Sequence, residues 1–209
     1  MNLASSNEKR PHKLKDDLRS VAQKAILASA EKVFAEQGLR ATVETVAKRA
    51  GVAVGTLYNY FADREALLVA LLEDRSSEIA RRLDHALDVA GKKPFAVQLT
   101  AYFNAVLEHF DEHRAFLSIV MQCENEQALR EKKSTTKRTL RTLSTHAERL
   151  VAFGVKSGAL DHDDADLHAT IVLGLIRGVV HRHLQNQKSG PLAPLAPRLT
   201  RFFLAGAGK

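Results

Sequence analysis

The sequence predicts an all-α protein of about nine helices, with an N-terminal three-helix helix-turn-helix domain followed by a larger helical domain. Two observations indicate this fold class. Apolar residues recur at the spacing of one helical face along most of the chain, and strand-like alternation is absent. The stretch 42–61, TVETVAKRAGVAVGTLYNYF, also has the spacing of two short helices on either side of a glycine turn.

A basic arm and a first helix come before that stretch. Residues 1–17 hold several lysines and arginines without an apolar stripe, so we expect a disordered arm that samples phosphate or the minor groove; a solvated tail is the alternative. From Leu18 to Gln37 apolar residues recur at helical spacing, and Gly38 ends the run. This helix should close a three-helix core within a domain spanning 18–75.

The stretch 42–61 contains its own start and stop signals. The Thr42 hydroxyl can cap the first helix, and Gly51 supplies the left-handed residue that ends it. A second helix then begins near Val54, with Leu57 and Phe61 expected in the core. Two helices around such a turn form the arrangement that inserts its second helix into the major groove of DNA.

Together with its neighbours, this stretch resembles the DNA-binding domain of the tetracycline-repressor (TetR) family of bacterial transcriptional regulators over about residues 22–72. The matching residues are Ile26, Leu27, Phe34, Gly38, Thr42, Val46, Ala47, Ala50, Gly51, Val52, Gly55, Thr56, Leu57, Tyr58, Tyr60, Phe61, Glu65, Leu67 and Leu68.

The resemblance and the side-chain chemistry together assign candidate DNA contacts. Hydroxyl groups, and the guanidinium of the arginine after the second helix, can bind backbone phosphates. Lysine and arginine in the first helix can bind phosphates or base edges, and an asparagine amide can form two hydrogen bonds with adenine. Small and apolar residues at the leading edge allow close approach and contact with thymine methyls. The candidates are Thr42, Lys48, Arg49, Val54, Gly55, Thr56, Tyr58, Asn59, Tyr60 and Arg64.

Further helices are expected from Asp63 almost to Gly91, from about Pro94 through Phe110, and over about 114–124, 126–157 and 167–187, with a short terminal helix after Pro197. The segment 76–209 resembles the effector-binding and dimerisation domain of the family in outline. Its candidate effector contacts are apolar or aromatic residues and one arginine: Tyr102, Phe103, Leu107, Phe110, Phe116, Met121, Phe153, Leu173 and Arg177. Core packing is the alternative for the aromatic residues, and inter-subunit contact is the alternative for Arg177 with His181.

The basic run from Arg130 to Arg141 is most simply interpreted as a solvent-exposed helix face, although an acyl-thioester or other phosphate-bearing effector could bind to it. A single helix-turn-helix domain contacts too few base pairs to select one operator among many DNA sequences, so we expect a homodimer on a pseudo-palindromic double-stranded operator. The candidate interface residues lie on the helix 167–187 and on the terminal helix: Leu175, Val179, His183, Phe202 and Phe203.

Catalytic motifs are missing from the sequence, so we do not expect an enzyme or a cofactor. His109 and His113, like His162 and Asp166, have the i, i+4 spacing that metal ligands use. An exposed charged helix end, with Asp111, Glu112 and Arg114 beside the first pair, is the alternative, and we assign no metal. The single cysteine, Cys123, precludes an internal disulfide, and the N-terminus lacks a signal-peptide pattern. These features predict a cytoplasmic, nucleoid-associated bacterial protein without a membrane partner.

The predicted function is a DNA-binding transcriptional regulator, most simply a dimeric repressor that a small-molecule effector releases from its operator. An activator, and a DNA-bound interaction protein of the same fold without an effector, are the alternatives.

Overall fold

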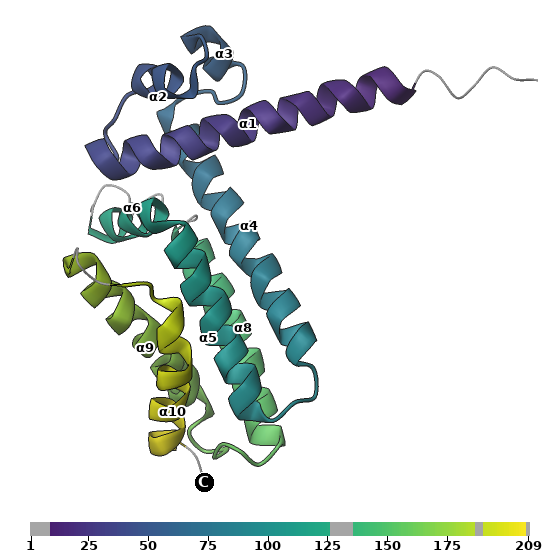
Figure 1. Ribbon diagram of the computed structural model, residues 1–209, viewed down its shortest axis with the longest axis vertical. Helices are drawn as coiled ribbons and strands as arrows, with labels where there is room; N and C mark the ends of the chain where they lie inside the picture. The colour runs from purple at the N-terminus through teal and green to yellow at the C-terminus, as the bar shows by residue number, and fades with distance from the viewer. Residues whose placement is uncertain (1–8, 126–135, 187–189, 208–209) are drawn as a thin grey trace, which may run out of the picture. The chain divides into compact units, whose positions relative to one another are not determined.

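The computed structural model describes residues 9–125, 136–186 and 190–207 (Figure 1). Within these ranges the elements are α-helices and one short 3-10 helix, so the predicted all-α class is confirmed. They are α1 (Lys9–Gln37), α2 (Val43–Ala50), α3 (Val54–Tyr58), α4 (Arg64–Ala90), α5 (Phe95–Glu112), α6 (Arg114–Asn125), α8 (Thr136–Lys156), α9 (Ala165–Gln185), η1 (Ala193–Leu195) and α10 (Ala196–Ala207).

The chain divides into two compact units, Met1–Leu71 and Leu72–Lys209. The division falls inside α4, and the sequence likewise places the domain boundary, at residue 75, inside a helix. Helix α1 begins at Lys9, within the stretch assigned to the basic arm. Residues 1–8 of that arm lie outside the described residues, as do the side chains of residues 9–16.

In the first unit, α2 packs against both α1 and α3. Phe34 of α1 and Leu57 of α3 have no exposed surface, and Phe61 is only 4% exposed, which confirms the core positions predicted for Leu57 and Phe61. Burying each of these side chains contributes about 1.5–3 kcal/mol. Gly51 has φ 70°, so a residue without a Cβ allows the sharp turn between α2 and α3.

Helix α5 is the central element of the second unit. It contacts α6, α8, α10 and η1 (Figure 1). Leu99, Phe103 and Leu107 on this helix are fully buried. The buried Tyr102 hydroxyl donates to the Leu143 carbonyl at 2.9 Å, so its polar atom is satisfied inside the core.

The last turn of α5 also fixes the start of the C-terminal helix. The Asp111 carboxylate accepts from the amide of Leu192 at 2.7 Å and from that of Ala193 at 2.9 Å. Helix α10 then begins at Ala196, immediately before Pro197 rather than after it. The expected start was late because proline is compatible with the first turn of a helix, where its missing N–H has no partner to lose.

Close packing at the end of α8 gives a stability prediction. A Cβ on Gly154 would lie 2.8 Å from both Leu160 Cδ1 and Phe95 Cε2, two buried side chains. We expect Gly154→Ala to lower the free energy of unfolding by about 1–3 kcal/mol in urea denaturation at a fixed protein concentration. As a control, Gly206→Ala adds a Cβ that meets nothing within 4 Å and should leave stability nearly unchanged. Equal stability of the two variants would contradict the close packing.

Candidate nucleic-acid interface and ligand cavity

The start of α2 is capped as the sequence predicts. Thr42 Oγ1 accepts from the amide of Thr45 at 3.3 Å and lies 3.2 Å from its hydroxyl. Hydrogen bonds from the Glu44 backbone amide and from the Thr42 hydroxyl hold the pKa of the Glu44 carboxyl below its usual range. The exposed Thr42 hydroxyl therefore sits beside a charged carboxylate, and a phosphate contact there has to use the remaining helix amides.

Helix α3 has a buried side and an exposed side. Leu57 points into the core, whereas Thr56, Tyr58 and Asn59 are exposed, Tyr58 to 47%. Val54 is half-buried, and a Cβ added to Gly55 would meet nothing within 4 Å, so packing within the chain does not require glycine there. The exposed side therefore presents three hydrogen-bonding side chains and, at Gly55, a position where the DNA backbone could approach closely.

Two of the predicted arginines already have partners within the unit. Arg49 Nη1 bonds to Glu36 Oε1 at 2.8 Å, and this bond raises the pKa of Arg49 and lowers that of Glu36. Arg64 Nη1 donates to the Leu39 carbonyl at 2.8 Å. Because a guanidinium carries five N–H groups, Arg64 can hold the turn after α1 and still offer donors to phosphate.

Other cations of this unit are better placed for phosphate. Lys48, in the last turn of α2, is exposed. The guanidinium of Arg19 lies 5.7 Å from the centroid of the Tyr60 ring, so α1 brings a cation beside a predicted phosphate-binding tyrosine. The sequence places Arg19 in a basic N-terminal run but does not show that it lies next to Tyr60.

The second unit contains a cavity of about 770 Å³ between α5, α6, α8 and α9. Its size falls in the usual range for small-molecule sites. Its walls are mostly apolar, with hydroxyl groups, one carboxylate and two guanidinium groups among them. The lining residues are Phe110, Leu117, Val120, Thr139, Leu140, Arg141, Leu143, Ser144, Thr145, Glu148, Thr170, Leu173, Gly174, Ile176, Arg177 and Val180.

Three of the predicted effector residues, Phe110, Leu173 and Arg177, line this cavity. The others are distributed differently. Four are fully buried in the surrounding core: Tyr102, Phe103, Leu107 and Phe116. Phe153 is half-buried and does not line the cavity, and the side chain of Met121 lies outside the described residues. Burial raises the pKa of the Tyr102 hydroxyl, which suits its structural role.

The hydroxyl-rich wall from α8 was missed by sequence reasoning. Thr139, Ser144 and Thr145 lie on a helix with a regular apolar stripe, and no sequence signal distinguishes them from surface residues. Arg141 is the part of the basic run that lines the cavity. Arg130, Lys132 and Lys133 lie outside the described residues, as do the side chains of Lys137 and Arg138.

One cavity residue is hydrogen-bonded to α4. The hydroxyl oxygens of Thr139 and Ser76 are 2.5 Å apart, and both side chains are buried. Since such a buried pair loses its bonding if either partner moves away, this hydrogen bond ties α4 to this part of the cavity wall.

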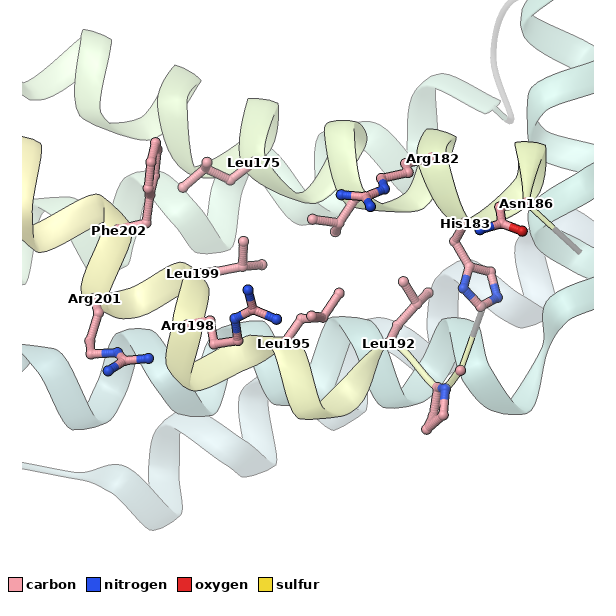
Figure 2. A pocket seen from close by; sticks show the side chains of 13 residues that line it. Leu175, Arg182, His183, Asn186, Leu192, Leu195, Arg198, Leu199, Arg201 and Phe202 are labelled. Carbon is pink, nitrogen blue, oxygen red and sulfur yellow. The ribbon is translucent and has the colours of Figure 1, made fainter. Parts of the chain in front are cut away.

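A separate groove of about 920 Å³ lies between α9 and the segment η1–α10 (Figure 2). Leu175 and Phe202 stand at one end of it, and His183 and Asn186 at the other. Four predicted interface residues line the groove, Leu175, Val179, His183 and Phe202, and the Phe202 side chain is 71% exposed. The fifth, Phe203, is buried, its ring 6.5 Å from that of Phe95 and 5.9 Å from that of His168.

Comparisons with known proteins agree with this architecture. Residues 26–71 match the sequence profile of the family described as bacterial regulatory proteins, tetR family. A fatty acid metabolism regulator protein of Bacillus subtilis (strain 168) is 25% identical over 185 residues, covering 87% of this chain and 93% of the relative. The transcriptional repressor KstR2 of Mycolicibacterium smegmatis is 34% identical over 100 residues, 47% of each chain.

Two solved structures share the fold at 23% identity. The fatty acid degradation regulator FadR of Bacillus halodurans superposes with a TM-score of 0.77, covering 88% of this chain and 98% of that one. FadR of Bacillus subtilis in complex with stearoyl-CoA has a TM-score of 0.75 with the same coverage. Among the described residues, no helix is both long and apolar enough to cross a membrane.

The exposed position of Lys48 gives a test of the DNA interface. We expect Lys48→Ala to weaken binding about equally on matched and mismatched duplexes, and to reduce the slope of log affinity against log salt by about one for each bound subunit. Fluorescence anisotropy at several salt concentrations measures both effects. The control, Lys156→Ala, removes the same charge from an exposed position at the end of α8 and should leave the slope unchanged. Equal slopes for both variants would remove Lys48 from the interface.

Proposed function

We propose that this chain, whose residues 26–71 match the TetR family of bacterial regulatory proteins, is a dimeric repressor that leaves its operator when an acyl-thioester binds in the cavity of the second unit. The observation that carries the proposal is that cavity, with apolar walls and two guanidinium groups, Arg141 and Arg177. DNA binding itself follows from the family and from the helix-turn-helix of the first unit.

For DNA recognition, we assign positioning and base reading to different side chains. Lys48, Tyr58, Tyr60 and Arg64, with Arg19 beside Tyr60, supply positive charge and hydroxyl donors to the phosphate backbone. The exposed Thr56 and Asn59 are the base-reading candidates, and Gly55 permits close approach. Thr42, Arg49 and Val54 complete the proposed interface, with Arg49 held by Glu36.

The chemistry of the cavity supports an effector with an apolar chain and an anionic end. Phe110, Leu117 and Val120 suit a hydrocarbon chain. Arg141 and Arg177 suit phosphate, which guanidinium groups bind with two parallel hydrogen bonds. Glu148, also in the wall, accepts a hydrogen bond from Ser144 at 2.7 Å, and its charge disfavours an anion at that point. One of the relatives is a fatty acid metabolism regulator, and one of the similar structures holds stearoyl-CoA.

The Thr139–Ser76 hydrogen bond supplies a route from the effector to α4. A ligand that displaces Thr139 breaks or stretches the bond to Ser76, and α4 contains residues of both units because it runs from Arg64 to Ala90. An effector has to bind the released state only 5–150-fold more tightly than the operator-bound state, a coupling of about 1–3 kcal/mol.

For assembly, the groove between α9 and α10 supports a homodimer. Leu175, Val179 and Leu199 form its apolar part, and Phe202 stands largely in solvent at its end. An exposed phenylalanine beside an apolar groove is typical of a surface that another protein covers. A two-fold partner provides a second phenylalanine for the equivalent groove, as a self-complementary interface requires.

The effector proposal predicts that stearoyl-CoA lowers operator affinity about 5–150-fold, whereas coenzyme A alone or stearate alone acts weakly. We expect Arg177→Ala to weaken the stearoyl-CoA response about 10–100-fold, the loss of a charge-assisted bond, without changing operator affinity in its absence. The measurement is operator binding titrated with each compound. Arg149→Ala is the control, because its side chain is 67% exposed and does not line the cavity.

An unchanged operator affinity with all three compounds would contradict the acyl-thioester proposal. It would favour the alternative of a DNA-bound interaction protein without an effector. Activation instead of repression would appear as higher transcription from the operator-bearing promoter when the protein is present.

The dimer proposal predicts that Phe202→Asp shifts the protein toward monomer at micromolar concentration, because a charge would be buried at the interface. Sedimentation velocity measures the shift, and operator affinity should fall with it. The control is Val89→Asp on α4, where the native side chain is 62% exposed and lies outside the groove. A Phe202→Asp protein that stays as dimeric as Val89→Asp would remove this face from the interface.

A further inference from the structure

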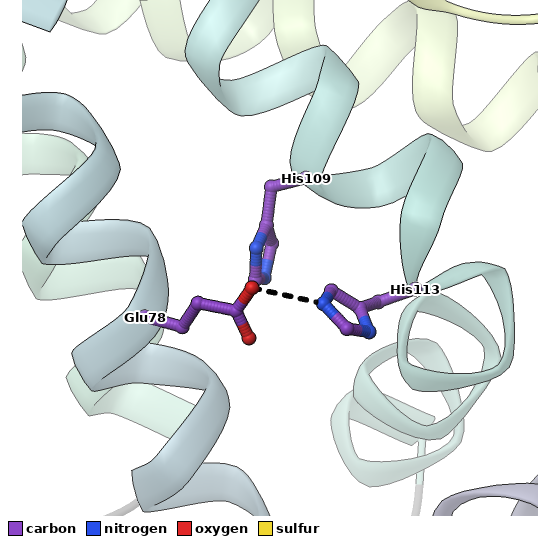
Figure 3. Close-up of side chains that lie close together, drawn as sticks. All are labelled: Glu78, His109 and His113. Atoms are coloured by element: carbon purple, nitrogen blue, oxygen red, sulfur yellow. Dashed lines mark hydrogen bonds and ion pairs between the residues drawn. The ribbon is translucent and has the colours of Figure 1, made fainter.

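Three side chains that could bind a metal ion converge between α4 and the end of α5 (Figure 3). Glu78 comes from α4, His109 from the last turns of α5, and His113 follows α5 directly. One ligand atom from each residue can be chosen so that all lie within 4.8 Å of one another. His113 Nε2 is 3.1 Å from Glu78 Oε1, and the two imidazole centroids are 4.8 Å apart.

His109 is the least ordinary member of this cluster. Its side chain has no exposed surface, and neither ring nitrogen has a hydrogen-bond partner in the structure as described. Its neighbours include the rings of Phe110 and Phe116, which meet it edge-on and satisfy neither nitrogen. Since buried polar atoms in native proteins nearly always have partners, an unsatisfied imidazole that faces a carboxylate and a second imidazole indicates a missing ligand.

We propose that Glu78, His109 and His113 bind a divalent transition-metal ion, with Zn²⁺ as the best match to the donor set. Two imidazoles and one carboxylate form a known three-residue zinc set, with a water from solvent as the fourth ligand. Mg²⁺ and Ca²⁺ fit poorly because they prefer oxygen ligands, and this cluster offers two nitrogens.

The geometry requires a modest contraction. Ligand atoms around a tetrahedral Zn²⁺ lie about 3.3 Å apart, so the widest pair in the cluster has to close by about 1.5 Å. His109 is held by the core. Glu78 and His113 are 22% and 18% exposed, so their side chains can turn toward it, and the same exposed sides give an ion access from solvent.

Burial and neighbouring charges shift the pKa values of two residues in the cluster. Burial, and then the neighbouring His113, lower the pKa of His109 to about 4. Burial alone would raise the pKa of the Glu78 carboxyl, but the His113 hydrogen bond and nearby cations hold that pKa at about 2. His113 binds through Nε2 when its ring proton is on Nδ1.

Two arginines next to Glu78 oppose a cation unless they have other partners, and both do. Arg75 Nη1 is 3.1 Å from Glu78 Oε2 and also 3.1 Å from Asp74 Oδ2. Arg82 contacts Glu78 Oε1 at 3.1 Å and forms a second ion pair with Glu112. Three carboxylates thus surround two guanidinium groups, and Glu78 can give one oxygen to a metal while an arginine keeps the other. Such a bonded second oxygen orients a ligating carboxylate.

The test uses the full-length protein, freed of metal with a chelator and titrated with Co²⁺ and then Zn²⁺. We expect one Co²⁺ per chain, with the intense visible absorption of four-coordinate cobalt, and displacement by Zn²⁺. Glu78→Gln and His113→Gln each remove a ligand and should weaken binding at least about 100-fold. Circular dichroism and thermal unfolding without metal verify that each variant is folded.

The control variant is His162→Gln, which removes an exposed histidine that lies outside the cluster. It should bind Co²⁺ like the unmodified chain. The proposal is overturned if the unmodified protein shows no saturable 1:1 binding, if its cobalt spectrum is the weak one of six-coordinate ions, or if folded Glu78→Gln and His113→Gln proteins bind as tightly as His162→Gln.

Discussion

The complete burial of one face of α5 is the constraint on which the second unit depends. Tyr102, Phe103 and Leu107 are fixed in the core, so the helix can neither rotate nor slide without exposing aromatic surface. Its last turns then present different chemistry to three neighbours. Phe110 reaches the cavity, Asp111 caps η1, and His109 faces Glu78. The fixed position of α5 therefore also fixes the relative positions of the cavity, the start of α10 and the histidine cluster.

Helix α4 is hydrogen-bonded both to the cavity wall and to the histidine cluster. Ser76 bonds to Thr139 of the cavity wall, and Glu78, two residues further along, bonds to His113 at the end of α5. An effector acting through Thr139 and an ion held by Glu78 would thus bias the same helix from different neighbours. If the effector and the ion favour different arrangements of α4, linkage requires that each lower the affinity for the other. This coupling would act through α4 and would need no contact between the two ligands.

The helix-turn-helix is predictable from sequence because its signals are local. A threonine cap at residue 42, a glycine in the left-handed region at residue 51 and the buried Leu57 each act within a few residues of themselves. The cavity is different, since an aromatic residue at helical spacing looks the same whether it faces the core or a ligand. Phe202 and Phe203 differ by one helical step, yet one is largely exposed and the other is buried. Glu78 joins His109 only through tertiary packing, so no sequence spacing reveals it.

The exposed side of α3 holds few side chains that could form hydrogen bonds with base edges. The helix spans only Val54–Tyr58, and its leading residues offer methyl groups and a glycine. Arg49 is paired with Glu36, and Arg64 is bonded to the Leu39 carbonyl, so neither guanidinium is fully available to a base edge. The proposed direct readout therefore rests on Thr56 and Asn59, and neither makes the bidentate contact to guanine that arginine makes. Under this proposal the preference for an operator depends substantially on how readily the duplex deforms, because a deformed duplex brings its phosphates to proposed contacts such as Lys48.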